Sequence, residues 1–292
     1  MSSSFAGIVK AARPHQWVKN LFVVAPLVFA KGLADPNLVL RSVAAFFSFS
    51  FAASAVYLLN DVADVEADRQ HPVKRNRPIA SGRVTPAAAR TAMASLALMG
   101  VGGAALLGLP VAACVAGYLL LNVAYTFKLK HVPYIDVLCI AAGFLLRVLT
   151  GTFALAVEAT PYLLIVTFLL SLFLGFGKRM HELQTGGGKQ QRQVLSSYRA
   201  PVLNVLLQLT ALATTGTYVI YTLDPATREF FGTDYLAATI VFTEFGVIRF
   251  MDLVKDQSKA ESPTEQMLKD WPFLLNLVLW AVAVVVVLYV TT

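Results

Sequence analysis

Four oxygen-bearing side chains recur within one short stretch of the sequence, residues 60–68. Asn60, Asp64 and Asp68 follow one another at intervals of four residues, and Asp61 lies shortly before Asp64. A continuous helix places all four on one face, where the carboxylates repel one another. A divalent cation relieves that repulsion, and Mg²⁺ accepts such oxygens while it bridges to phosphates. The spacing therefore predicts a Mg²⁺ site; the alternative is a solvated, acidic helix end.

A basic segment follows the acidic one. Lys74, Arg75 and Arg77 come soon after Asp68. Where a metal ion neutralises part of a diphosphate, Lys and Arg side chains bind the remaining phosphoryl oxygens. We therefore predict that these three residues bind a diphosphate group. The alternative is that the run only flanks a membrane-spanning helix, as basic runs commonly do.

A second polar group lies near residue 180, at the end of an apolar stretch. It contains Lys178 and Arg179, whose positive charges suit phosphoryl oxygens, and Glu182. The alternative is a simple salt bridge between Lys178 and Glu182, which are four residues apart. Further candidates for contact with substrate lie near the ends of other apolar stretches: Lys19, Tyr125, Lys130 and Asp136.

One arginine, Arg147, lies inside an apolar stretch. A lipid-exposed cation there costs several kcal/mol, so we expect its side chain to face the interior of a helical bundle. A structural pair with Glu244 and a role in ligand binding are both open for it.

These residues belong to a strongly apolar chain. Of its 292 residues, 57% are hydrophobic and 14% charged, with a mean hydropathy of +0.65, whereas soluble domains carry about 25% charged residues. A soluble enzyme is therefore excluded, and an all-α polytopic membrane protein is predicted. Because about 20 apolar residues cross a bilayer, we expect nine spans that form a single transmembrane catalytic domain, residues 1–292. The expected spans are 16–33, 39–60, 87–107, 110–127, 135–156, 161–180, 201–223, 233–254 and 271–291.

Positive charge is distributed unevenly between the two sides of this predicted bundle. Of the 24 Lys and Arg, only Lys31, Arg41 and Arg228 fall on the side opposite the N-terminus, and Arg147 lies within a span. The positive-inside rule then predicts that the N-terminus and the long connections are cytoplasmic and the C-terminus is outside. We expect the membrane to be a plasma membrane of bacterial type. The net charge of +7 follows from this topology, so we expect no nucleic-acid partner.

The nine predicted spans and their polar motifs resemble the UbiA superfamily of intramembrane prenyltransferases. The first motif of that superfamily has the form NDxxDxxxD, which residues 60–68 match. The second motif is usually rich in Asp, whereas residues 177–183, GKRMHEL, contain none. The resemblance implies a UbiA-like bundle with cytoplasmic active-site loops and a Mg²⁺ cofactor held by Asn60, Asp61, Asp64 and Asp68.

The basic second motif resembles one branch of the superfamily, the decaprenyl-phosphate phosphoribosyltransferases. Further short matches lie along most of the chain, at residues 13–20, 74–80, 129–131 and 263–265. The resemblance implies transfer of the 5-phosphoribosyl group from 5-phosphoribosyl-1-diphosphate to a polyprenyl phosphate, with release of diphosphate. Both substrates carry many anionic oxygens, which suits a basic motif. Substrate-binding roles are implied for Lys19, Asn20, Lys74, Arg75, Arg77, Tyr125, Lys130, Asp136, Lys178, Arg179 and Glu182.

Two other functions stay open at this point. An ordinary UbiA-type enzyme moves an isoprenyl group from a prenyl diphosphate to an aromatic acceptor. A transporter also has many apolar helices, but it is expected to carry intramembrane acids along a pathway and paired repeats. The acids of this sequence cluster instead at one predicted face.

The predicted topology can be tested with single cysteines placed at Gly187 and at Thr233, in a background that lacks Cys114 and Cys139. Because the charge asymmetry puts residue 187 in the cytoplasm and residue 233 outside, an impermeant thiol reagent added to intact cells should label position 233 alone. Labelling of position 187 alone would reverse the topology.

Overall fold

The computed structural model describes residues 2–185, 193–258 and 261–290. Within these ranges the regular elements are α-helices and short 3-10 helices, without a strand, so the predicted all-α class is confirmed. Part of the predicted connection 181–200, residues 186–192, lies outside the described residues. The α-helices are α1 Ser2–Ala12, α2 Ala25–Phe29, α3 Pro36–Ala63, α4 Val65–Gln70, α5 Pro86–Leu107, α6 Leu109–Phe127, α7 Ile135–Leu155, α8 Pro161–Gln184, α10 Ala200–Leu223, α11 Pro225–Phe231, α12 Ile240–Lys255, α13 Pro263–Gln266 and α14 Trp271–Tyr289. The 3-10 helices are η1 Pro14–Val23, η2 Gly32–Ala34, η3 Lys74–Asn76, η4 Leu129–His131, η5 Gln193–Ser197 and η6 Tyr235–Thr239.

Seven of the described helices are long and apolar enough to cross a membrane: α3, α5, α6, α7, α8, α10 and α14. They confirm seven of the nine expected spans. The expected span 16–33 is instead the broken series η1, α2 and η2, and the expected span 233–254 consists of η6 followed by the 16-residue α12.

The first of these interruptions has a backbone cause. Arg13 precedes η1 and Lys31 precedes η2, and both adopt left-handed conformations, with φ of 53° and 56°. Pro14 opens η1 and Pro26 lies in the first turn of α2. Proline lacks the amide hydrogen that a continuous helix needs, so a regular helix cannot run through this stretch.

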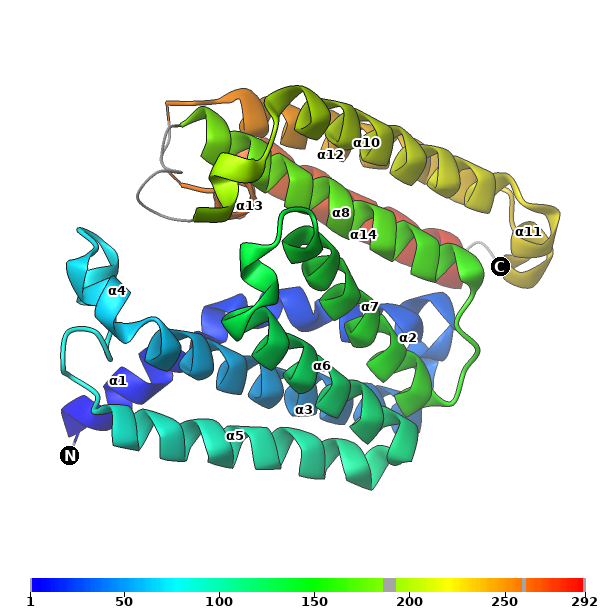
Figure 1. Cartoon of the computed structure of the whole chain (residues 1–292). Helices are drawn as coiled ribbons and strands as arrows, with labels where there is room; N and C mark the ends of the chain where they lie inside the picture. Colours follow the sequence, from blue (N-terminus) through cyan, green and yellow to red (C-terminus); the bar gives the residue numbers. More distant parts are fainter. Residues whose placement is uncertain (1, 186–192, 259–260, 291–292) are drawn as a thin grey trace. The chain divides into compact units, whose positions relative to one another are not determined.

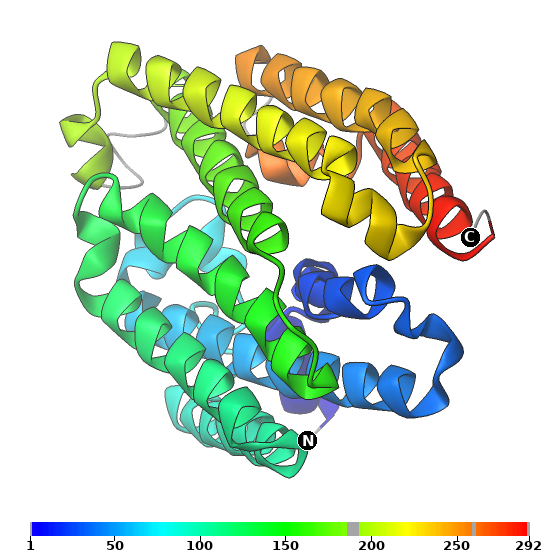
Figure 2. The ribbon, with the colours of Figure 1, turned by 90° about the vertical axis from the view of Figure 1, so that its right-hand side faces the viewer.

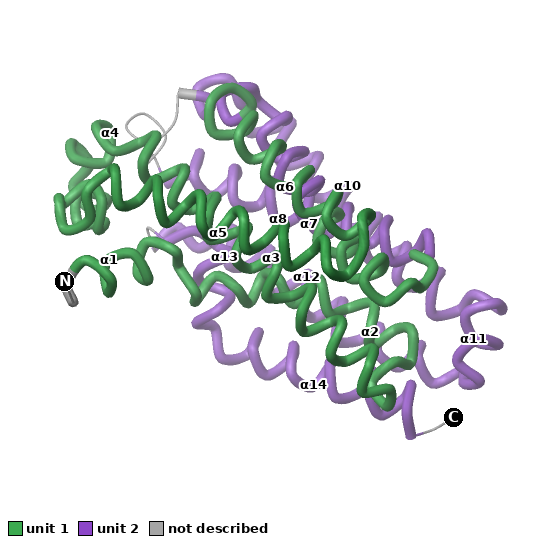
Figure 3. The backbone as a smooth tube through the Cα atoms, turned by 90° about the horizontal axis from the view of Figure 1, so that it is seen from below, with its two compact units in different colours: residues 1–129, 145–159 green, residues 130–144, 160–292 purple. Residues whose placement is uncertain are grey.

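The chain groups into two compact units, coloured separately in Figure 3. Unit 1 comprises residues 1–129 and 145–159, and unit 2 comprises residues 130–144 and 160–292. The chain passes from one unit to the other within α7, so the single domain expected from the sequence stays a prediction. Cys114 of unit 1 and Cys139 of unit 2 are buried free thiols.

Unit 1 is built on α3 and α5, which lie side by side (Figure 1, Figure 2). Small residues allow this close approach, because a Cβ at Gly100 would lie 2.8 Å from the Ser48 carbonyl oxygen. Such contacts between small residues are the usual means of helix association in membranes. At the far end of α3, the Arg41 side chain donates to the carbonyl oxygens of Leu107, at 3.0 Å, and Ala154, at 2.6 Å. This arginine fastens the ends of α5 and α7 to α3.

Unit 2 has its own core, in which α8 and α10 pack together (Figure 1). Phe173 and Phe250 are buried at its centre, with ring centroids 5.0 Å apart. Gly177 on α8 lies against Phe250, and a Cβ there would come within 2.5 Å of that ring. Gly177, the first residue of the second polar motif, therefore lets α12 pack directly against α8.

A matched pair of glycine substitutions tests the packing of unit 1. A Cβ at Gly151 would lie 1.9 Å from the Val23 carbonyl oxygen, whereas a Cβ at Gly102 meets nothing within 4 Å. Gly151→Ala should therefore destabilise the protein by at least about 1–3 kcal/mol, the range typical of overpacking. Gly102→Ala should be neutral or slightly stabilising, because alanine favours a helix. Equal thermal unfolding midpoints for the two detergent-purified variants would contradict the η1–α7 contact.

Candidate functional site

The acidic motif of unit 1 is built around Asp61, a buried residue in the last turn of α3. Two arginines donate to the same oxygen, Asp61 Oδ1: Arg13 Nη2 at 2.6 Å and Arg77 Nη1 at 3.2 Å. Its other oxygen, Oδ2, is buried and has no hydrogen-bond partner among the described residues. A buried carboxylate oxygen without a donor is costly, so this atom marks a place where the protein is suited to accept a ligand.

Arg77 also joins Asp61 to Asp68, because its Nη1 lies 2.6 Å from Asp68 Oδ2. Asp68 is buried on α4. The predicted continuous helix through residues 60–68 is wrong: α3 ends at Ala63, and Asp64 connects it to α4. Aspartate is a poor residue for a helix interior, because its side chain competes for backbone hydrogen bonds. The kink gathers Asp61 and Asp68 around one guanidinium, while Asp64 stays half-buried.

Local structure holds Arg13 in place. Arg13 connects α1 to η1 in a left-handed conformation, which costs an L-residue about 1–3 kcal/mol and is compensated by surrounding contacts. Ser54 Oγ donates to the Ala12 carbonyl oxygen at 2.9 Å, and Tyr57 places its ring 5.2 Å from the Arg13 guanidinium carbon. Arg13 was not among the residues assigned a role from the sequence, although it opens the 13–20 motif.

The loop that carries the other predicted basic residues is organised by His71. Its Nδ1 accepts hydrogen bonds from the backbone amides of Val73, at 3.1 Å, and Lys74, at 3.2 Å. Partial burial and the nearby Lys74 charge lower the pKa of His71, which keeps the ring neutral and able to accept. Lys74 is half-buried and Arg75 is exposed.

Asn60 is held from α6. Thr126 Oγ1 lies 2.6 Å from Asn60 Oδ1 and 2.7 Å from the Asn122 carbonyl oxygen. The threonine is buried directly after Tyr125, which is half-buried. Sequence reasoning selected Tyr125 and missed Thr126, because a threonine in an apolar span usually bonds only to its own helix.

Asn20 and Arg147 form a separate buried network in unit 1. Arg147 Nε donates to Asn20 Oδ1 at 2.9 Å, and Asn20 Nδ2 donates to Ser50 Oγ at 2.9 Å. The guanidinium carbon lies 5.0 Å from the ring centroids of both Phe49 and Tyr118. An amide and two aromatic faces thus stabilise this intramembrane cation, and Asn20 is committed to it. Glu244 lies in unit 2, and the Arg147–Glu244 pair stays a prediction.

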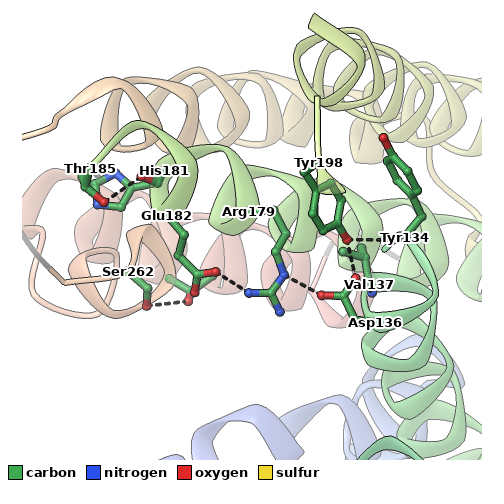
Figure 4. A network of polar contacts seen from close by, with 10 residues as sticks. Tyr134, Asp136, Val137, Arg179, His181, Glu182, Thr185, Tyr198 and Ser262 are labelled. Atoms are coloured by element: carbon green, nitrogen blue, oxygen red, sulfur yellow. Dashed lines mark hydrogen bonds and ion pairs between the residues drawn. The ribbon is translucent and has the colours of Figure 1, made fainter. Parts of the chain in front are cut away.

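In unit 2, Arg179 is enclosed by acids (Figure 4). This arginine on α8 is almost fully buried; its Nε lies 2.8 Å from Asp136 Oδ2, and its Nη1 donates to Glu182 Oε2. Asp136, at the start of α7, is itself fully buried. The structure therefore brings together three residues that were selected separately from the sequence. The positive charge of Arg179 is thus bound by carboxylates of its own unit.

Tyr198 completes this network, as Figure 4 shows. Its hydroxyl donates to Asp136 Oδ1 and accepts the Tyr134 backbone amide at 2.8 Å. Burial and the hydrogen bond to Asp136 raise the pKa of Tyr198, so the phenol stays a donor at neutral pH. A lone tyrosine after a polar connection carries no signal in the sequence, and Tyr198 was missed.

The remaining predicted cations, Lys19, Lys130 and Lys178, are all half-buried. Lys19 belongs to η1 of unit 1, and Lys130 and Lys178 belong to η4 and α8 of unit 2. Over the described residues, no three His, Cys, Asp or Glu side chains are arranged to hold a metal ion. Asp61 is paired with Arg77, and Asp136 is paired with Arg179.

Comparison with known proteins decides the family. Residues 20–268 match the profile of the UbiA prenyltransferase family. The chain belongs to this family. Curated relatives called decaprenyl-phosphate phosphoribosyltransferase include one from Corynebacterium glutamicum, 34% identical over 97% of this chain and 87% of the relative. Another, from Mycobacterium tuberculosis, is 35% identical over 96% of this chain and 93% of the relative.

Solved structures of UbiA proteins share the fold. A UbiA homolog from Archaeoglobus fulgidus bound to GPP and Mg²⁺ has a TM-score of 0.72 at 16% identity, covering 97% of this chain and all of that one. A UbiA homolog from Aeropyrum pernix, in its apo form, has a TM-score of 0.70 at 13% identity, covering 93% of this chain and 97% of that one. The predicted UbiA-like helical fold is thereby confirmed.

In this UbiA protein, the pairing of Arg179 with two acids predicts that replacing Arg179 lowers the stability of the fold. Arg179→Met leaves Asp136 and Glu182 without their cation, and breaking a buried pair in this way costs about 3–5 kcal/mol. The unfolding midpoint in detergent should fall sharply. The control is Arg69→Met, which breaks an exposed Arg69–Glu66 pair worth at most about 1 kcal/mol. Equal midpoints for the two variants would show that the Arg179 network contributes little.

Proposed function

We propose that this protein transfers the 5-phosphoribosyl group from 5-phosphoribosyl-1-diphosphate to a polyprenyl phosphate and releases diphosphate. The observation that carries the proposal is the similarity, over nearly the whole chain, to enzymes named decaprenyl-phosphate phosphoribosyltransferase. The lack of Asp in residues 177–183 agrees with it, since a phosphoribosyl donor and a phosphorylated lipid favour basic side chains.

The acidic cluster of unit 1 suits a Mg²⁺ ion. Asp61 Oδ2 is a buried oxygen without a donor, and Asp68 and Asn60 are held nearby in the same segment. Asn60, Asp61, Asp64 and Asp68 are all oxygen donors of the kind that this hard cation accepts. When bound there, Mg²⁺ would neutralise charge on the diphosphate leaving group.

The arginine pairs give the cluster a second property. Arg77 pairs with both Asp61 and Asp68, so these two buried acids are held together around one guanidinium. We assign the departing diphosphate to Lys74, Arg75 and Arg77 of the same loop, with Arg77 also pairing with the acids. Charge-assisted hydrogen bonds of this kind stabilise the developing charge.

The reaction itself needs little acid–base chemistry. An oxygen of the lipid phosphate bonds to the ribose anomeric carbon while the bond from that carbon to the diphosphate breaks, and the diphosphate leaves with the electron pair. A phosphate monoester is already ionised at pH 7, so positioning and electrostatics supply most of the rate. The transition state has oxocarbenium character, as in other glycosyl transfers.

We assign the remaining phosphate contacts to Lys19, Lys130 and Lys178, and we change the role of Arg179. Its guanidinium is bound by Asp136 and Glu182, so it positions the end of α8 that carries Lys178. Tyr198 has the same positioning role through Asp136. In this assignment the active-site loops are cytoplasmic.

Asp64→Asn tests the metal site. The change keeps the size of the side chain and removes one charge from the acidic segment, so turnover should fall by several orders of magnitude, with only partial rescue by excess Mg²⁺. Glu66→Gln, on the exposed face of α4, removes a charge from the same segment and should have almost no effect. Near-normal turnover by Asp64→Asn, in protein that extracts folded in detergent, would refute the site.

Lys178→Met tests the donor. The substitution keeps the apolar stem and removes one charge-assisted contact, worth about 1.5–3 kcal/mol, so kcat/KM for phosphoribosyl diphosphate should fall roughly ten- to hundredfold. Diphosphate release by the wild type is measured in parallel with prenyl diphosphate plus an aromatic acid. If only the prenyl donor releases diphosphate, the protein is an aromatic prenyltransferase, and the Asp-rich metal site stands because both donors leave as diphosphate.

A further inference from the structure

Helix α1 has one face that is packed within unit 1. Ala11 is buried in a cluster with Leu58 of α3 and Ala89 of α5, and Ile8 packs against the same cluster. Gly7 is buried on this face, where a Cβ would lie 2.6 Å from a methyl carbon of Val84. The helix is therefore fixed to the protein along this side.

The opposite face of α1 is apolar and uncovered. Phe5 is 71% exposed and Val9 is 42% exposed, and Ala6 and Lys10 are exposed beside them. These four positions form one continuous stripe at helical spacing. A face that presents an aromatic and an aliphatic side chain, with a lysine along its edge, is typical of a helix that lies in a membrane interface.

The neighbours of α1 fix its level relative to the bilayer. Its buried face belongs to a cluster that includes Leu58, about one turn before the end of α3, and Ala89, in the first turn of α5. Both helices are candidate membrane spans, so α1 lies where α3 leaves the membrane and α5 enters it. Only 11% of the apolar segment of α5 is buried among the described residues, which leaves part of the surface of this neighbouring helix for lipid. In Figure 1, α1 lies beside the start of α5.

We propose that the exposed stripe of α1 binds the lipid bilayer at the boundary between headgroups and acyl chains. Phe5 and Val9 enter the acyl region, and Lys10 lies at the level of the lipid phosphates. The stripe belongs to a helix that packs in one cluster with the ends of two candidate membrane spans, α3 and α5, which makes the bilayer the occupant. This inference is independent of the reaction proposed above.

The anchor has a consequence for the acidic motif. Arg13 follows directly after the last residue of α1, and its side chain pairs with Asp61. A helix held in the interface fixes the backbone from which this arginine extends. The membrane surface thereby becomes part of the support for Asp61.

Spin labels test the proposal in the full-length protein. Single cysteines replace Phe5 or Val9 in a background without Cys114 and Cys139, are labelled with a nitroxide, and the protein is placed in nanodiscs that contain anionic lipid. Two reference positions bracket the scale: Leu106, 90% exposed on α5, for lipid, and Glu66, exposed on α4, for water. All four side chains point away from the packed core, so each labelled variant should fold.

Power saturation with oxygen and with a water-soluble nickel complex reads the environment. We expect the ratio of oxygen to nickel accessibility at positions 5 and 9 to exceed that at position 66 several-fold and to approach that at position 106. A ratio equal to that at position 66 would mean that the stripe faces water and would overturn the proposal. Low accessibility to both reagents with dipolar broadening between labels would mean that a second copy of the chain covers the stripe, which would also overturn it.

Discussion

The buried carboxylate of Asp61 is the constraint on which the rest of unit 1 depends. It lies at the end of a membrane-spanning helix, where an isolated charge would be expensive, and it is stabilised by Arg13 from the N-terminal segment and Arg77 from the loop after α4. Segments distant in sequence therefore converge on one acid. Because both arginines bind Oδ1, Oδ2 keeps its capacity to accept a ligand. Charge compensation thus shapes this part of the fold and leaves one oxygen of the acid for the proposed Mg²⁺ ion.

Unit 2 also contains a buried charge with partners of opposite sign, but here the central charge is positive. Here the buried charge at the centre is a cation, Arg179, and the partners are Asp136 and Glu182, with Tyr198 on the far side of Asp136. The network connects the start of α7, the end of α8 and the segment before α10. Buried pairs of this kind contribute little net stability compared with apolar packing, but they penalise any arrangement that separates them. They therefore fix where neighbouring side chains such as Lys178 lie.

Much of this was predictable because it depends on local pattern. Apolar length predicted seven of the helices. The spacing of residues 60–68 predicted that Asp61 and Asp68 lie near each other, as their shared contact with Arg77 shows. The sequence misled where tertiary contacts override local pattern. The acidic stretch is interrupted at Asp64, and Arg77 pairs with Asp61 and Asp68 from the two sides of the interruption. The expected first span is broken by prolines and left-handed residues. Tyr198 and Thr126 could not be found, since their partners are distant in sequence. Arg179 was identified, but its role depended on two acids whose approach only the fold reveals.

The central claim is that a UbiA fold with a basic second motif transfers phosphoribose to a lipid phosphate. Mass spectrometry of the lipid formed by the purified protein tests this most directly, with polyprenyl phosphate, Mg²⁺ and ribose-labelled phosphoribosyl diphosphate as substrates. We expect a lipid that carries both phosphates and the labelled ribose, and we expect no such product without a divalent cation. If the lipid stays unlabelled while the same protein prenylates an aromatic acid, phosphoribosyl transfer is contradicted.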